Sequence, residues 1–170
     1  NLKEIYIPDK VTLIAGSVFQ DCTSLETVRF SPNITYISNR SFSGCTSLTA
    51  VTLPTSLTAL PSYTFQNCTA LAYVGFGSGL NTIYRSAFRG CTALSEVSLS
   101  NGVTYLEHWV FADCPALTSV SLPDTLASLG YQIFLNDTAL TKINIPVGYN
   151  NSPSYSYGAF TGYSHLFENC

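Results

Sequence analysis

Cysteine is the residue type in this chain with the clearest capacity for chemistry. The chain has six cysteines, and five of them recur at a constant spacing of 23 residues: Cys22, Cys45, Cys68, Cys91 and Cys114. Neighbours in such a column lie within disulfide reach, but their side chains point in parallel and five cannot all pair. Zinc needs converging ligands, and the sequence has no Cys-x-x-Cys or His-x-x-x-His spacing. We therefore predict buried free thiols and no metal site.

Two further positions belong to the question of cysteine chemistry. The sixth unit carries Asp137 where the column predicts a cysteine, which fits either a loss of burial or a local hydrogen bond near the end of the repeats. Cys170, the last residue of the printed sequence, lies outside the 23-residue spacing. We predict that Cys170 is the one thiol available for an intermolecular disulfide.

The other reactive side chains do not combine into a catalytic set. The two histidines are His108 and His165, and neither has a nucleophile implied by its spacing. The Gly-x-Ser-x-Gly turn of hydrolases and the Gly-x-x-x-x-Gly-Lys phosphate loop do not occur. We expect no enzymatic activity, no catalytic residue and no cofactor.

Five Asn-x-Ser/Thr sequons occur, beginning at Asn33, Asn39, Asn67, Asn136 and Asn150. Asn67 and Asn136 lie next to the cysteine column, where a glycan would be crowded. The sequence therefore predicts Asn33, Asn39 and Asn150 as glycosylation sites if the protein comes from a eukaryote.

The cysteine spacing belongs to a repeat that runs through most of the chain. Phenylalanine recurs three residues before the cysteine column, at Phe19, Phe42, Phe65, Phe88, Phe111 and Phe134, and leucine opens successive units. Each unit has two short segments with apolar residues at alternate positions, such as 48–53, which is typical of half-buried strands. The remaining third is long enough only for a tight turn or a single helical turn. Such units bury a core only by stacking, which predicts a solenoid with parallel β-sheets.

The repeat pattern carries a family resemblance. The succession Leu-x-x-Val-x-Leu-Pro-x-x-Leu-Thr-x-Leu…Phe-x-x-Cys resembles the 23-residue leucine-rich repeats of the BspA type, which are related to the treponemal repeats, over residues 2 to about 146. This resemblance implies a right-handed leucine-rich repeat solenoid, mostly β, at the cell surface or secreted. It also implies a role in adhesion or partner binding.

The regular spacing ends near Pro146. We predict that 1–146 holds six repeats and the start of a seventh, and that 147–170 is a degenerate seventh repeat that forms a C-terminal cap. In this alignment Phe160 takes the phenylalanine position and Tyr163 the cysteine position. No comparable cap precedes Leu2, so the first unit is expected to expose an apolar end.

Composition excludes several classes of function. The 170 residues are 10% charged, with seven Lys plus Arg, ten Asp plus Glu and a net charge of −3. Without a basic run the chain is not expected to bind nucleic acid. No stretch approaches the ~20 unbroken apolar residues of a membrane span.

Binding is expected on the outward residues of the first strand of each unit, which form continuous columns. Tyr6, Arg29 and Tyr73 are the best anchors there, because Tyr and Arg dominate binding hot spots. One hypothesis is a cell-surface or secreted module that recognises a protein or glycan. A second is head-to-tail self-assembly into an extracellular filament through the uncapped first unit. A third is that the chain is an internal stretch of a longer solenoid.

Overall fold

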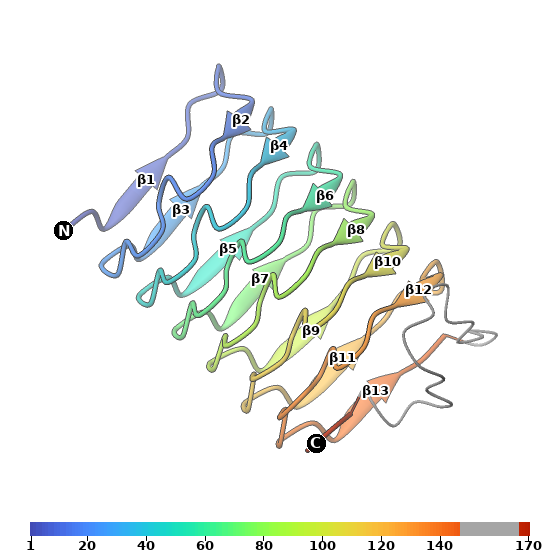
Figure 1. Cartoon of the computed structure of the whole chain (residues 1–170). Helices are drawn as coiled ribbons and strands as arrows, with labels where there is room; N and C mark the ends of the chain where they lie inside the picture. The colour runs from blue at the N-terminus through green and yellow to red at the C-terminus, as the bar shows by residue number, and fades with distance from the viewer. Residues whose placement is uncertain (147–166) are drawn as a thin grey trace.

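The computed structural model describes residues 1–146 and 167–170, which wind into a solenoid of parallel β-strands (Figure 1). The described residues contain no helix. The first strand of each unit spans three residues: β1 (Glu4–Tyr6), β3 (Thr27–Arg29), β5 (Ala50–Thr52), β7 (Tyr73–Gly75), β9 (Glu96–Ser98), β11 (Ser119–Ser121) and β13 (Lys142–Asn144). The second strand spans two residues: β2 (Leu13–Ile14), β4 (Tyr36–Ile37), β6 (Ala59–Leu60), β8 (Thr82–Ile83), β10 (Tyr105–Leu106) and β12 (Ser128–Leu129).

Strand pairing follows the 23-residue repeat without a shift. Ile5 lies opposite Val28, and Val51 lies opposite Val74. The central residue of each first strand points inward, while its two neighbours point outward, as period-2 strands require. The prediction of a leucine-rich repeat solenoid with parallel sheets is therefore confirmed.

The last third of each unit is a turn because two of its residues adopt left-handed backbone conformations. One of these positions holds only Asp, Asn or Gly, the residue types that tolerate positive φ best. Its members are Asp21, Gly44, Asn67, Gly90, Asp113 and Asn136, with φ between 57° and 76°. A left-handed residue in every turn interrupts right-handed helix formation, which explains the absence of helix from the described turns.

The phenylalanine column forms the centre of the core. Phe42, Phe65, Phe88, Phe111 and Phe134 are fully buried, and successive rings stack with centroids 5.4 to 6.0 Å apart. The predicted burial of the cysteines is confirmed for Cys45, Cys68, Cys91 and Cys114, while Cys22 in the first repeat is only half-buried.

The alignment of the last repeat differs from the one expected from the sequence. Phe167 stacks on Phe134, with centroids 5.9 Å apart and planes at 7°, so it continues the phenylalanine column. Asn169 has φ 60° and donates a side-chain hydrogen bond to Asn136 Oδ1, as Asn136 does to Asp113. Phe160 and Tyr163, to which those positions were assigned, lie outside the described residues. Residues 167–170 therefore close the last described turn of the stack.

Cys170 consequently occupies the cysteine position of that turn, although it lies outside the 23-residue spacing. Its Sγ–H donates to the Phe134 carbonyl at 3.0 Å. Cys114 makes the same contact with the Phe88 carbonyl at 3.4 Å, one turn earlier. The insertion between Phe134 and Phe167 hid this match, because it lengthens the spacing without changing the Phe-x-x-Cys motif.

Candidate functional site

The outward face of the first-strand sheet presents two columns of side chains. Tyr6 and Tyr73 are the most exposed large hydrophobic residues on it, at 58% and 61% exposure. Arg29 lies directly beside Tyr6 in the strand register, and its Nε is 3.6 Å from Glu4 Oε1. Both members of this ion pair are well exposed, so water screens it and leaves Arg29 available for other partners.

The structure brings only two of the three predicted anchors together. Tyr6 and Arg29 are neighbours in one column, whereas Tyr73 stands in the other column, next to Ala50. Tyr73 is three repeats from Tyr6 along the stack. The face therefore offers one compact pair and one separate tyrosine, which suits an extended partner better than a small ligand.

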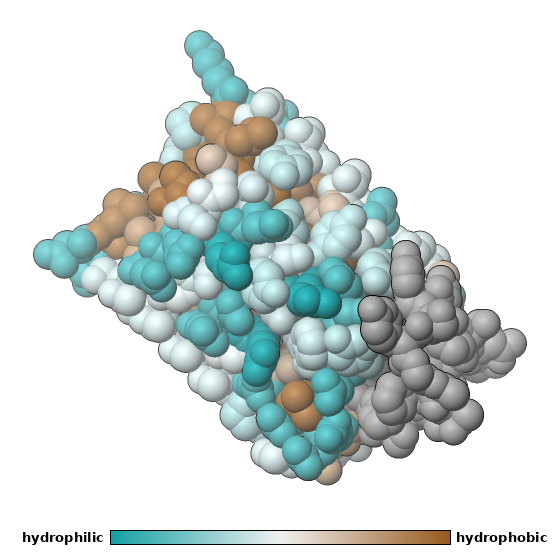
Figure 2. Space-filling model, viewed as in Figure 1, coloured by the Kyte–Doolittle hydropathy of each residue, from teal (hydrophilic) through white to brown (hydrophobic). Residues whose placement is uncertain are grey.

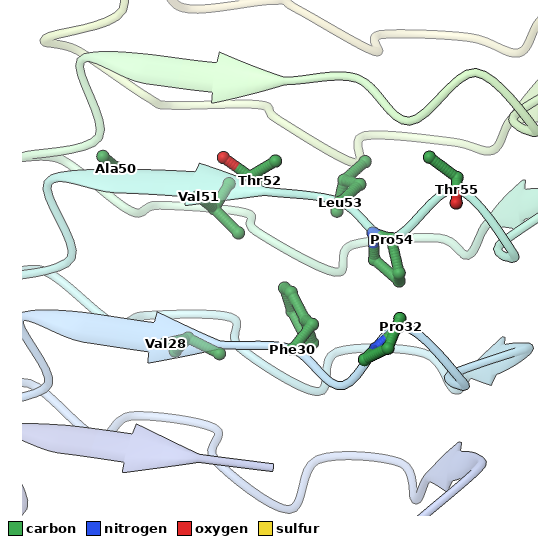
Figure 3. Close-up of a pocket in the computed structure, with 9 residues that line it drawn as sticks. All are labelled: Val28, Phe30, Pro32, Ala50, Val51, Thr52, Leu53, Pro54 and Thr55. Atoms are coloured by element: carbon green, nitrogen blue, oxygen red, sulfur yellow. The ribbon is translucent and has the colours of Figure 1, made fainter. Parts of the chain in front are cut away.

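A shallow opening interrupts this face between β3 and β5 (Figure 3). Only Thr27 and Ala50 are in register there, whereas the adjoining β5–β7 junction keeps three pairs. The residues at the same position in three other units, Ile7, Leu53 and Leu99, donate their N–H to a carbonyl of the next strand, but the N–H of Phe30 makes no such bond among the described residues. Phe30 instead packs edge-on against Phe42, with centroids 5.6 Å apart. The larger ring at this position wedges the strand ends apart.

A second break lies beyond Phe76, which also packs edge-on, against Phe88 at 5.7 Å. The sheet divides between β7 and β9 at this point. Phenylalanine replaces the aliphatic residue of the other units at both breaks. The sequence contained this signal, but the effect on pairing depends on how each ring packs in the core.

The buried thiols of the cysteine column are protonated at neutral pH. Burial raises the pKa of Cys45 to about 12 and that of Cys91 well above its ordinary value, so both stay protonated at neutral pH. Each buried thiol donates to a phenylalanine carbonyl of the preceding unit, as Cys68 does to Phe42 at 3.2 Å. The described residues contain no cluster of His, Cys, Asp and Glu that could hold a metal ion.

Asp137 is fully buried in that column, so the interpretation that the sixth unit loses burial here was wrong. Its Oδ1 accepts a hydrogen bond from the Cys114 N–H at 2.8 Å, which confirms the alternative of a local hydrogen bond. Its Oδ2 has no hydrogen-bond partner among the described residues. Burial raises the pKa of Asp137 to about 8.

Sequence comparison identifies the repeats. The family model of the BspA-type leucine-rich repeat region matches in six copies, over residues 1–114 and 73–169. The chain belongs to the BspA-type leucine-rich repeat family. A comparison with curated proteins found no significant match.

Solved structures of leucine-rich repeat proteins share the fold. The leucine-rich repeat protein of T. pallidum is 28% identical with a TM-score of 0.82, over 86% of this chain and 71% of that one. A leucine-rich repeat protein from Eubacterium ventriosum is 29% identical with a TM-score of 0.81, over 86% of this chain. One from Bacteroides ovatus is 27% identical with a TM-score of 0.65, over 88% of this chain. The chain spans 40% and 44% of the length of the latter two proteins.

Within these BspA-type repeats, the predicted glycosylation sites differ in their surroundings. Asn33 and Asn39 are exposed, and the Asn33 amide donates to the Asp9 carbonyl at 3.0 Å. Asn150 lies outside the described residues. Glycosylation at these three sites stays a prediction.

The BspA-type turns also carry a surface cluster that the sequence analysis did not identify. His108 stacks on Tyr131 with centroids 3.8 Å apart, and Arg85 lies over the Trp109 ring at 5.1 Å. His108 Nδ1 accepts a hydrogen bond from the Tyr131 N–H, and burial lowers the pKa of His108, so the ring stays neutral. Arg85, His108 and Tyr131 share the 23-residue spacing, which was the available signal.

Among the residues that the structure describes, no helix is long and apolar enough to cross a membrane.

Proposed function

We propose that this chain is a non-enzymatic recognition module that acts outside the cell or at its surface, where it mediates adhesion. Its binding surface is the outward face of β1, β3, β5 and β7. The observation that carries this proposal is the exposed pair Tyr6 and Arg29 on one four-stranded sheet, with Tyr73 on the same face of that sheet. The surface location rests on the resemblance to BspA-type surface proteins.

The chemistry of this face favours binding over catalysis. Tyrosine provides a large contact area with few rotatable bonds, and arginine provides planar hydrogen-bond donors. Both residue types are enriched in binding hot spots. The nearby opening between β3 and β5 is lined by the apolar side chains of Phe30, Pro32 and Pro54. A protein or glycan lying along the stack can contact the tyrosines and place an apolar group in this opening.

Binding to a deposited layer of extracellular matrix tests the proposal. The labelled protein should bind this layer saturably. The double variant Tyr6→Ala/Arg29→Ala should bind with an affinity lower by about tenfold or more, because one hot-spot residue contributes ~1–2 kcal/mol. Ser121→Ala provides the matched control, since Ser121 is an exposed outward residue of β11 on the same side of the stack.

Saturable binding that is lost in the Tyr6→Ala/Arg29→Ala variant and retained in Ser121→Ala supports the proposal. Binding that never saturates, or that falls equally in both variants, contradicts it. Circular dichroism of each variant confirms that the solenoid is intact, which is expected because the substituted side chains are exposed.

A second candidate function is head-to-tail assembly into a filament. The first described repeat exposes apolar side chains, with Leu13 at 53% exposure and Leu2 and Val18 also exposed (Figure 2). Covering such an end with the last repeat of another copy would continue the stack and generate an open chain of molecules. Size-exclusion chromatography with negative-stain microscopy tests it: filaments abolished by Leu13→Lys support assembly, and a monomer at high concentration contradicts it.

A further inference from the structure

A groove lies on the second-strand side of the solenoid, away from the face proposed above. It crosses the third repeat between Tyr36 and Tyr84, and Ala59 and Pro61 line it between them. Tyr36 is 51% exposed and Tyr84 is 40% exposed, so both rings are open to solvent. The two tyrosines belong to repeats two and four, so they lie on either side of the third repeat.

The groove exists because of two residues in the third repeat. Ala59 is small where the same column holds Tyr36 in the second repeat and Tyr105 in the fifth. Pro61 has no N–H, whereas Ser38 and Tyr84 at the same position donate to the carbonyls of Ile14 and Leu60. The second-strand sheet is divided between β4 and β6 at this proline.

The lining is neutral throughout. None of the eight residues around the groove carries a charge, and six of them are Thr, Asn, Ser or Tyr. The side chains of Asn39, Thr58 and Ser62 make no hydrogen bond within the described part of the chain. Their amide and hydroxyl groups are therefore free to donate to and accept from a ligand.

We infer that this groove binds a neutral oligosaccharide. The apolar C–H face of a sugar ring packs on an exposed tyrosine ring, as apolar groups do on amphipathic aromatic side chains. The many hydroxyls of the sugar then match the free amide and hydroxyl groups of the rim. A charged ligand would find no counter-charge among the lining residues, and a proline-rich peptide would leave most of these polar groups unused.

Titration with defined probes tests this inference. Maltohexaose, cellohexaose and chitohexaose are the saccharide probes, decaproline is the peptide probe, and calorimetry or ligand-observed NMR is the readout. We expect saturable binding of at least one saccharide. Tyr36→Ala and Tyr84→Ala should each weaken it about 3- to 10-fold, the effect of losing one aromatic packing contact.

Two further variants make the test specific to the groove. Ala59→Tyr fills it with the side chain that occurs elsewhere in the same column, and it should abolish saccharide binding without removing any aromatic ring. Tyr131→Ala removes a comparably exposed tyrosine from the sixth repeat, outside the groove, and should leave the affinity unchanged.

Failure of all three saccharides to bind overturns the inference, as does wild-type affinity in Ala59→Tyr. Binding of decaproline without any saccharide overturns it as well and identifies the groove as a peptide site. These outcomes do not depend on the first-strand face, so they are independent of the matrix-binding test.

Discussion

Asp137 is an acidic residue at a position where the other described repeats carry a cysteine. It replaces a cysteine that would lie fully buried, and one of its two carboxylate oxygens has no hydrogen-bond partner among the described residues. A buried carboxylate without a second partner favours the protonated form, which is why the pKa of Asp137 is raised to about 8. The folded chain therefore holds a proton that the unfolded chain releases near pH 4.

This linkage makes the free energy of unfolding depend on pH. Between about pH 4 and about pH 8 the folded state binds more protons than the unfolded state, so stability falls as the pH rises and then levels off. Asp137→Asn removes the titrating group and keeps an oxygen for the Cys114 N–H. We expect the variant to match the wild type at pH 4 and to exceed it by about 1–3 kcal/mol at pH 8.

Urea unfolding at the two pH values measures this difference. Asp124→Asn is the control, because Asp124 is exposed and its replacement should leave the stability unchanged at both pH values. A gain for Asp137→Asn that is equal at pH 4 and pH 8 would show that the proton is not the cause.

At the scale of structural elements, the phenylalanine column holds the turns together. Phe88 is fully buried, with the ring centroids of Phe65 and Phe111 at 5.6 and 5.5 Å. Phe76 packs edge-on against it as well. A short two- or three-residue strand buries little surface by itself, so the stacked rings supply much of the contact between successive units.

Phe88→Ala should therefore lower the free energy of unfolding by about 3–5 kcal/mol, the cost of leaving a cavity in place of a buried aromatic ring. Chemical denaturation of the variant measures this loss. Val18→Ala is the control, because Val18 is exposed and its truncation should change stability by less than about 0.5 kcal/mol. A loss below ~1 kcal/mol for Phe88→Ala would contradict the structural role of the column.

At the scale of the whole molecule, one junction is weaker than the others. Between the second and third repeats, β3 and β5 share a single residue pair, and β4 and β6 are not paired. The turns still connect the two repeats, since the Phe42 N–H donates to Thr64 O at 3.0 Å. In a solenoid each repeat contacts only its neighbours, so a weak junction divides the stack into two cooperative units.

Native-state hydrogen exchange should therefore show a step in amide protection between residues 1–47 and the repeats that follow. Phe30→Leu/Pro61→Ser introduces the residues found at these positions in other units, Leu53 and Ser38, and should reduce the step. Phe76→Leu is the matched control at the β7–β9 break, where β8 and β10 remain paired. A gradual decline of protection from the first residue, without a step, would indicate simple fraying of the end.

The sequence by itself determined the fold class, the strand register and the core. Up to Pro146 the columns of this solenoid repeat at 23 residues, and strands that repeat in phase pair in register, so spacing alone predicts that Val51 lies beside Val74. The burial of Phe88 and Cys91 followed from the same argument. Tyr6 and Tyr73 were predicted to face outward because side chains alternate along a strand.

Only the tertiary structure decided where this regularity fails. The wedge at Phe30 depends on its packing against Phe42, and the groove at Pro61 depends on the side chains of two other repeats. The alignment of Phe167 with Phe134 spans an insertion whose length the repeat does not specify. The sequence period predicts the features that the units share. The candidate binding sites arise where a residue differs from the repeat, and the packing of residues in neighbouring repeats decides the local structure there.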